Sequence, residues 1–112
     1  MSNMINWTDF EKIDMRVGTI LEASIFEKAK KPAFILTIDF GKMGIKRSSA
    51  QITDLYSIES LPGQQIIAVV NFPSKQIANF HSECLVMGSV DNKGIVTLIQ
   101  PTCRVDNGLR IG

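Results

Sequence analysis

The sequence predicts an all-β fold, a small barrel assembled from short strands. Most of the chain alternates apolar and polar residues with a period of two, and turn-forming residues separate these runs. With 112 residues, of which 45% are hydrophobic and 21% charged, the chain has the size and composition of one globular unit. We therefore expect residues 1–112 to form a single domain with one core.

The first two elements are predicted to be a short helix and a long strand. The letters TDFE at residues 8–11 have the form of a capping box with Thr8 as N-cap, and Asp14 ends the predicted helix. The strand covers residues 16–26, because one parity carries Val17, Thr19, Leu21, Ala23 and Ile25. Gly18 offers a place for a bulge, since this run is long for one flat strand.

The next two strands are predicted over residues 33–40 and 45–51. The first has a wholly apolar face, made by Phe34, Leu36, Ile38 and Phe40. The second is rich in polar residues around Ile45 and Ala50. One face of this second strand is therefore available to a partner.

Three further strands are predicted, over residues 64–71, 83–90 and 95–100. The first is apolar on both faces, which indicates burial on both sides. The last two are joined by DNKG at residues 91–94, a hairpin signal. Residues 53–56 are interpreted as a short helix or turn, residues 72–82 as an irregular link, and Asn107-Gly108 as a turn.

This order of elements favours a five-stranded Greek-key barrel of the OB type, with short helical segments and extra terminal strands. An SH3-like barrel or a small sandwich has the same strand period. The alternation of residues alone leaves those two folds open.

Composition argues against several classes of function. The net charge of +1 creates no strong overall field, although six of the 12 basic residues lie between residues 28 and 47 and predict a modest basic patch. His81, Cys84 and Cys103 are too few for a four-ligand zinc site. The chain shows neither a signal peptide nor 18 consecutive apolar residues, so we expect a cytoplasmic protein without membrane insertion.

No catalytic motif is found in the sequence. P-loop, GxGxxG, HExxH and GxSxG patterns are absent, and the three-residue spacing of His81 and Cys84 directs their side chains to opposite faces of a strand. Ser48 and Ser49 have no neighbouring base and are interpreted first as strand hydroxyls, while Phe72 suits either the core or a cleft. We expect a binding protein, without enzymatic activity and without a cofactor.

Five motifs in sequence order resemble the tRNA-binding-domain family of OB-folds. They are DMRVGTI at 14–20, IDFG at 38–41, SSAQI at 48–52, VNFP at 70–73 and FHSECLVMG at 80–88. FEKID at 10–14 and the closing Ile111-Gly112 are similar to the CsaA-type chaperones of that family, and the resemblance covers residues 10–112. It implies an export-related chaperone that binds unfolded or presecretory polypeptides. It also implies a homodimer whose chain termini contribute to the interface.

Two departures from the RNA-binding members favour polypeptide over tRNA. The stretch KQIA at residues 75–78 keeps only Lys75 where those members commonly carry several basic residues, and Ala50 replaces their Gly. Each lost phosphate contact weakens RNA binding and its salt dependence together. With no ATP motif, polypeptide binding is expected to be passive.

Polypeptide and tRNA are predicted to use the same surface, between residues 28–33 and residues 71–82. Its candidate ligand contacts are Lys31, Phe34, Arg47, Ser48, Ser49, Gln51, Asn71, Phe72, Lys75, Ile77, Phe80 and Ser82. On the tRNA hypothesis the basic residues contact phosphates and Phe34 or Phe72 stacks a base. A structural adaptor that docks onto another protein is a third hypothesis.

Overall fold

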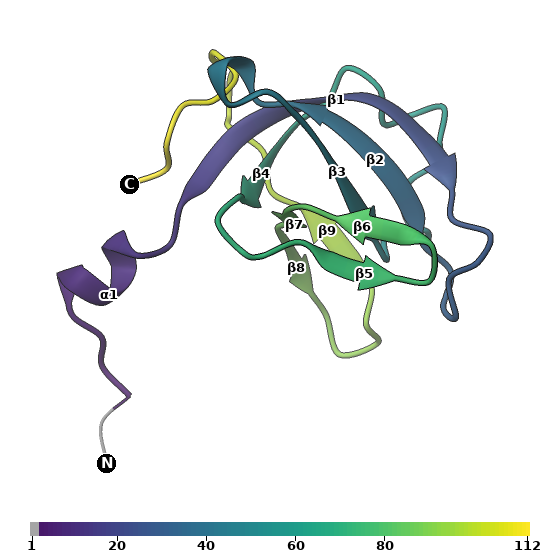
Figure 1. Cartoon of the computed structure of the whole chain (residues 1–112), viewed down its shortest axis with the longest axis horizontal. Helices are drawn as coiled ribbons and strands as arrows, with labels where there is room; N and C mark the ends of the chain where they lie inside the picture. The colour runs from purple at the N-terminus through teal and green to yellow at the C-terminus, as the bar shows by residue number, and fades with distance from the viewer. Residues whose placement is uncertain (1–2) are drawn as a thin grey trace.

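A computed structural model describes residues 3–112 and shows a five-stranded antiparallel sheet curled into a barrel (Figure 1). The strand order is β3-β2-β1-β4-β7, with bounds β1 (Met15–Ile25), β2 (Phe34–Asp39), β3 (Ile45–Ala50), β4 (Gln65–Val69) and β7 (Leu85–Val86). The other elements are α1 (Trp7–Glu11), the 3-10 turn η1 (Gly41–Met43), and two hairpins, β5 (Lys75–Ile77) with β6 (Phe80–Ser82) and β8 (Gly88–Val90) with β9 (Val96–Leu98). The predicted all-β barrel is confirmed.

Strand β1 organises the barrel because its two halves pair with different neighbours. Its first half pairs with β4, from Met15 opposite Val69 to Thr19 opposite Gln65. Its second half pairs with β2 and ends with Ile25 opposite Phe34. One long strand thus belongs to both sides of the barrel, as the length of the predicted run suggested.

The bulge in β1 lies at Leu21, so the predicted bulge at Gly18 is wrong. The register with β2 shifts between Ile20 and Glu22, and this extra residue breaks the parity on which Leu21 was expected to be buried. Gly18 has a different role, because a Cβ atom there would lie 2.6 Å from Cγ2 of Ile38. The glycine lets the core side chains of β2 approach the backbone of β1.

The core is built on the apolar face of β2, as predicted. Phe34, Leu36, Ile38 and Phe40 are all buried there, and they pack against Ile20, Ile52, Leu61 and Ile66. Strand β4 is buried on both faces except for the half-buried Ile67, which agrees with its nearly continuous apolar sequence.

The C-terminal segment closes the free edge of the first half of β1. The N–H of Gly108 donates to the carbonyl of Val17 (2.7 Å), and the N–H of Val17 donates to the carbonyl of Leu109 (3.0 Å). The buried amide of Gln65 donates to the carbonyl of Val105 and accepts from its N–H, at 2.7 and 3.1 Å. The predicted turn at Asn107-Gly108 is confirmed.

Helix α1 begins two residues earlier than its predicted cap allowed. Its N-cap is Asn6, whose side chain accepts from the N–H of Asp9 (2.9 Å), while the Asp9 carboxylate accepts from the N–H of Asn6 (3.3 Å). This reciprocal pair replaces the predicted cap at Thr8. The helix ends at Glu11, before the predicted end at Asp14.

Residues 72–82 contain the β5–β6 hairpin where an irregular link was predicted. Its turn places Ala78 at a φ of 54°, a left-handed conformation that Gly or Asn normally occupies. The predicted strand at 83–90 is divided into β7 and β8, and residues 53–55 form a turn where residues 53–56 were interpreted as a short helix or turn. The predicted hairpin at 91–94 is confirmed by the pairing of β8 with β9.

Candidate binding groove

The barrel is closed between the edge strands β3 and β7 by hydrogen bonds that involve side chains. The N–H of Glu83 donates to the carbonyl of Arg47 (2.8 Å), and the N–H of Arg47 donates to the Glu83 carboxylate (2.9 Å). One residue further, the hydroxyl of the fully buried Ser48 donates to the carbonyl of Cys84 (2.9 Å). We refer to this junction of β3 with residues 82–86 as the seam.

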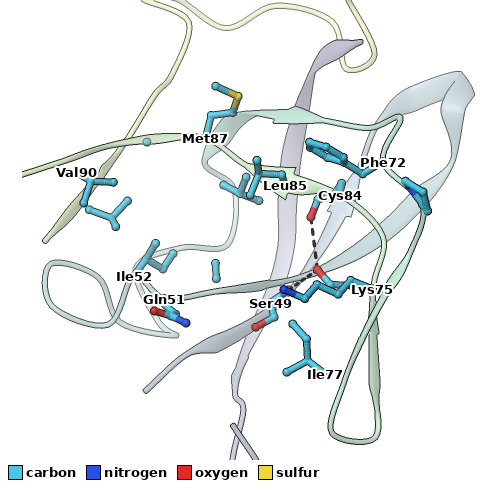
Figure 2. Close-up of a pocket in the computed structure, with 16 residues that line it drawn as sticks. Ser49, Gln51, Ile52, Phe72, Lys75, Ile77, Cys84, Leu85, Met87 and Val90 are labelled. Atoms are coloured by element: carbon cyan, nitrogen blue, oxygen red, sulfur yellow. Dashed lines mark hydrogen bonds between the residues drawn. The ribbon is translucent and has the colours of Figure 1, made fainter. Parts of the chain in front are cut away.

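Beyond Ser49 the seam opens into a groove of about 670 Å³ (Figure 2). Four segments line it: the end of β3, the link after β4, the β5–β6 hairpin and the run from β7 to β9. Their lining residues are Ser49, Ala50, Gln51, Ile52, Phe72, Pro73, Lys75, Ile77, Ser82, Cys84, Leu85, Val86, Met87, Gly88, Val90 and Val96. The walls are therefore mainly apolar, with polar groups from the end of β3 and from the β5–β6 hairpin.

Lys75 is the one charged side chain among these lining residues. The thiol of Cys84 adds no charge at neutral pH, because burial raises its pKa to about 11 against the smaller opposing effect of the Ser48 hydrogen bond. A neutral, buried thiol is a poor nucleophile. The groove thus combines apolar contact with a single positive charge.

The structure brings together half of the residues predicted as ligand contacts. Those that line the groove are Ser49, Gln51, Phe72, Lys75, Ile77 and Ser82. They come from the end of β3, from the link after β4 and from the hairpin, whereas residues 28–33, predicted as the other side of the binding surface, do not line the groove.

Three of the other predicted contacts are in the interior, and their assignment to a ligand surface is corrected. Phe34 belongs to the barrel core. Phe80 is buried in a second apolar cluster, where its ring packs edge-to-face on Phe26 at a centroid distance of 5.4 Å. Ser48 is buried and donates its hydroxyl to the seam.

The remaining three predicted contacts are exposed but do not line the groove. The Asn71 amide donates to the carbonyl of Lys12 (2.7 Å) and accepts from the N–H of Asp14 (3.1 Å), so it anchors the connection between α1 and β1. The guanidinium of Arg47 lies 4.9 Å from the ring centroid of Phe80. Lys31 lies in the loop between β1 and β2.

The basic residues predicted to form one patch are divided by the length of β2. Lys28, Lys30 and Lys31 precede β2, whereas Lys42 follows it in η1 and Lys46 pairs with Ile38 near its far end. A six-residue strand spans about 20 Å, so these two groups lie at opposite ends of the barrel wall. Arg47, the sixth predicted member of the patch, pairs with Thr37 between the two groups, and its guanidinium lies over the ring of Phe80.

Sequence reasoning missed the apolar wall of the groove. Its residues are Ile52, Leu85, Val86, Met87, Val90 and Val96. The letters LVM at residues 85–87 were a usable signal, because three consecutive apolar residues do not fit a half-buried strand. Leu85 is indeed 51% exposed, and it faces the groove.

Neither a metal site nor a membrane-spanning helix is found in the described part of the chain. No three His, Cys, Asp or Glu side chains within residues 3–112 are grouped to hold a metal ion. The helical segments in the same range lack the length and hydropathy needed to cross a bilayer.

An OB-type barrel with a groove at its seam defines a small binding domain. Residues 15–110 match the family described as "Putative tRNA binding domain". The chain therefore belongs to the tRNA-binding-domain family, which is a family of binding domains and not of catalytic ones.

Two solved structures share the whole fold with this chain. The chaperone CsaA of Bacillus anthracis is 51% identical, with a TM-score of 0.93 over 97% of this chain and 99% of that chain. CsaA from Picrophilus torridus is 52% identical, with a TM-score of 0.91 over 97% of this chain and 100% of that chain. The chain is thus similar to the CsaA type within the family.

A third relative, the methionine–tRNA ligase of Porphyromonas gingivalis, is 32% identical over 96% of this chain. The chain spans about 15% of the length of the methionine–tRNA ligases it matches. The similarity therefore concerns one domain of those enzymes.

The seam predicts different stabilities for two neighbouring serine variants. Ser48→Ala removes the shorter hydrogen bond to the Cys84 carbonyl and is expected to lower the free energy of unfolding by about 1 to 2 kcal/mol. Ser49→Ala is the matched control, because Ser49 takes part in the seam through its backbone alone, and its effect should stay within about 0.5 kcal/mol. Urea denaturation measures both, and equal stabilities of the two variants would show that the Ser48 hydroxyl does not hold the seam.

Proposed function

We propose that this protein is an export-related molecular chaperone that holds unfolded or presecretory polypeptides in the cytoplasm without ATP. The observation that carries the proposal is the mainly apolar groove at the open seam, with its single charged side chain, Lys75. The similarity to two CsaA chaperones supports it. Such a chaperone works by mass action: binding lowers the concentration of free unfolded client, so that less of it aggregates.

The exposed apolar side chains of the groove provide the binding energy. Phe72, Leu85 and Val90 each keep much of their surface in contact with solvent. Covering them with an apolar client contributes on the order of 1 kcal/mol per side chain. A sum of a few such contacts suits weak, reversible holding of many different sequences.

Binding of tRNA through the same surface is the alternative function. The family match and the similarity to one domain of methionine–tRNA ligases favour it. The charge distribution favours polypeptide. The five lysines between residues 28 and 46 are divided between the two ends of β2, and Lys75 is the one basic residue among those that line the groove. A tRNA site needs several cations along one phosphate path.

Suppression of client aggregation tests the chaperone proposal. The protein should reduce light scattering from a chemically denatured client, and the effect should persist at about 0.3 M salt because apolar contacts are not screened. Leu85→Ser should weaken client binding about fivefold, which corresponds to roughly 1 kcal/mol of lost apolar contact. Leu55→Ser is the control, since Leu55 is 56% exposed, close to the 51% of Leu85, and lies outside the groove.

The opposite pattern contradicts the proposal. It consists of a steeply salt-sensitive affinity for tRNA together with unchanged aggregation of every client. Equal activity of Leu85→Ser and Leu55→Ser would instead place client binding away from the groove.

We further propose that the protein is a homodimer and that both chain termini contribute to the interface. Helix α1 buries none of its side chains, and Trp7 is 79% exposed. A helix of five residues has too few internal hydrogen bonds to be stable without packing. The side chain of Arg110 donates to the carbonyl of Glu11 (2.8 Å), so the C-terminal segment and α1 lie on the same side of the barrel (Figure 1).

Sedimentation velocity tests the dimer. The wild-type protein should sediment as a dimer, and Trp7→Ser should shift it towards the monomer because a large apolar anchor is lost. Leu55→Ser, a change of an exposed apolar residue away from the termini, should leave the dimer intact. A wild-type monomer at micromolar concentration, or a Trp7→Ser protein that stays dimeric, contradicts the proposed interface.

A further inference from the structure

The edge of β3 that faces the seam presents a row of backbone groups. Arg47 points both its N–H and its carbonyl towards Glu83, whereas the N–H of Ser49 points to the hydroxyl of Ser82 (3.1 Å). Backbone groups of a strand alternate between its two neighbours, so the next residue with this orientation is Gln51. Strand β3 ends at Ala50, and the same alternation extended by one residue continues the row from Arg47 and Ser49 to Gln51.

This row has no partner strand in the groove. Within residues 3–112 the N–H and carbonyl of Gln51 make no hydrogen bond, and the carbonyl of Ser49 receives only a 3.4 Å contact from the Ser48 hydroxyl. Both residues line the groove. An unpaired strand edge beside an apolar groove is the arrangement that accepts an extended peptide by strand addition.

The walls of the groove suit the side chains of an added strand. Successive side chains of a strand point to opposite faces, so every second client residue enters the groove. Ile77 and Lys75 stand on one side in Figure 2, with Leu85 and Met87 on the other. Apolar client residues at alternate positions would contact the Leu85 wall.

Lys75 completes the recognition by charge. Neither of the two ion pairs in residues 3–112 involves it, because both are made by Asp14. It is the one charged group among the lining residues, so a carboxylate on the bound strand would have a cation opposite it and no acidic side chain of the groove to repel it.

We propose that the groove binds its client as an added β-strand along Ser49 and Gln51, and that Lys75 selects strands carrying an acidic side chain. This inference rests on the proposed polypeptide-binding function and specifies the client as an extended, alternating apolar segment with a carboxylate. Backbone pairing gives tolerance of sequence, whereas Lys75 gives the charge preference.

Fluorescence anisotropy with labelled nine-residue peptides tests the mode of binding. The parent peptide alternates valine and threonine and carries one glutamate. Two derivatives are N-methylated at alternate positions, one on each parity, so that only one loses the N–H groups that would face β3. That derivative should bind about tenfold more weakly than the other, since hydrogen bonds are lost and the methyl groups block pairing.

The charge preference is tested on the same peptides. Replacing the glutamate by lysine should weaken binding about fivefold to wild type, and Lys75→Glu should reverse that preference. Lys42→Glu is the matched control, because Lys42 lies in η1 outside the groove.

The outcomes separate this inference from the function on which it rests. Equal binding of the two N-methylated peptides overturns strand addition, and an unchanged charge preference in Lys75→Glu overturns the role of Lys75, while polypeptide binding itself stands in both cases. If none of the peptides binds and no client is protected from aggregation, the proposed function fails as well.

Discussion

The hydrogen bond from Ser48 to the carbonyl of Cys84 fixes the point where the barrel stops being closed. Before it, Arg47 and Glu83 exchange two hydrogen bonds; after it, the N–H of Ser49 makes one more bond, to the Ser82 hydroxyl, and β3 and β7 then become walls of the groove. The bond is buried, and without it the Cys84 carbonyl keeps only the 3.5 Å contact from the Ser82 hydroxyl, at a cost of about 1 to 2 kcal/mol. The free energy of this contact therefore keeps the opening at one place along the strands.

The β5–β6 hairpin, which forms one wall of the groove, is held in place by side chains that do not line the groove. Phe80, the first residue of β6, packs its ring on Phe26. The guanidinium of Arg47 also lies over the Phe80 ring, 4.9 Å from its centroid. Ile77 packs partly against the same cluster. The hairpin is thereby fixed to the loop after β1, so that Lys75 is presented to the groove on a paired strand. Phe80, expected to bind a ligand, is instead buried beneath the hairpin, with the guanidinium of Arg47 over its ring.

The sequence predicted those elements whose side-chain pattern coincides with burial. The apolar parity of β2 was sufficient because that strand buries one face along its whole length. The bulge at Leu21 was missed because it depends on pairing with β2 and leaves no glycine or proline in the chain. The hairpin was missed for a similar reason, since Ala78 occupies a conformation that Gly or Asn usually marks.

The site could be predicted only in part. Polar and charged residues such as Lys75 and Gln51 stand out in their motifs, and both line the groove. The apolar wall did not stand out, because Leu85 is assigned to a core by its chemistry and reaches the surface only where the seam opens. The family followed from the order of five motifs, and the match over residues 15–110 confirmed it.

The proposed function places the client polypeptide in the groove at the open seam. Methyl NMR of the protein with an unfolded client tests it most directly, because apolar side chains report their own contacts. We expect shifts of the methyl signals of Ile52, Leu85 and Met87, with those of the exposed Leu55 and Leu109 unchanged. Shifts confined to Leu55 and Leu109, with the three groove signals unmoved, would contradict it.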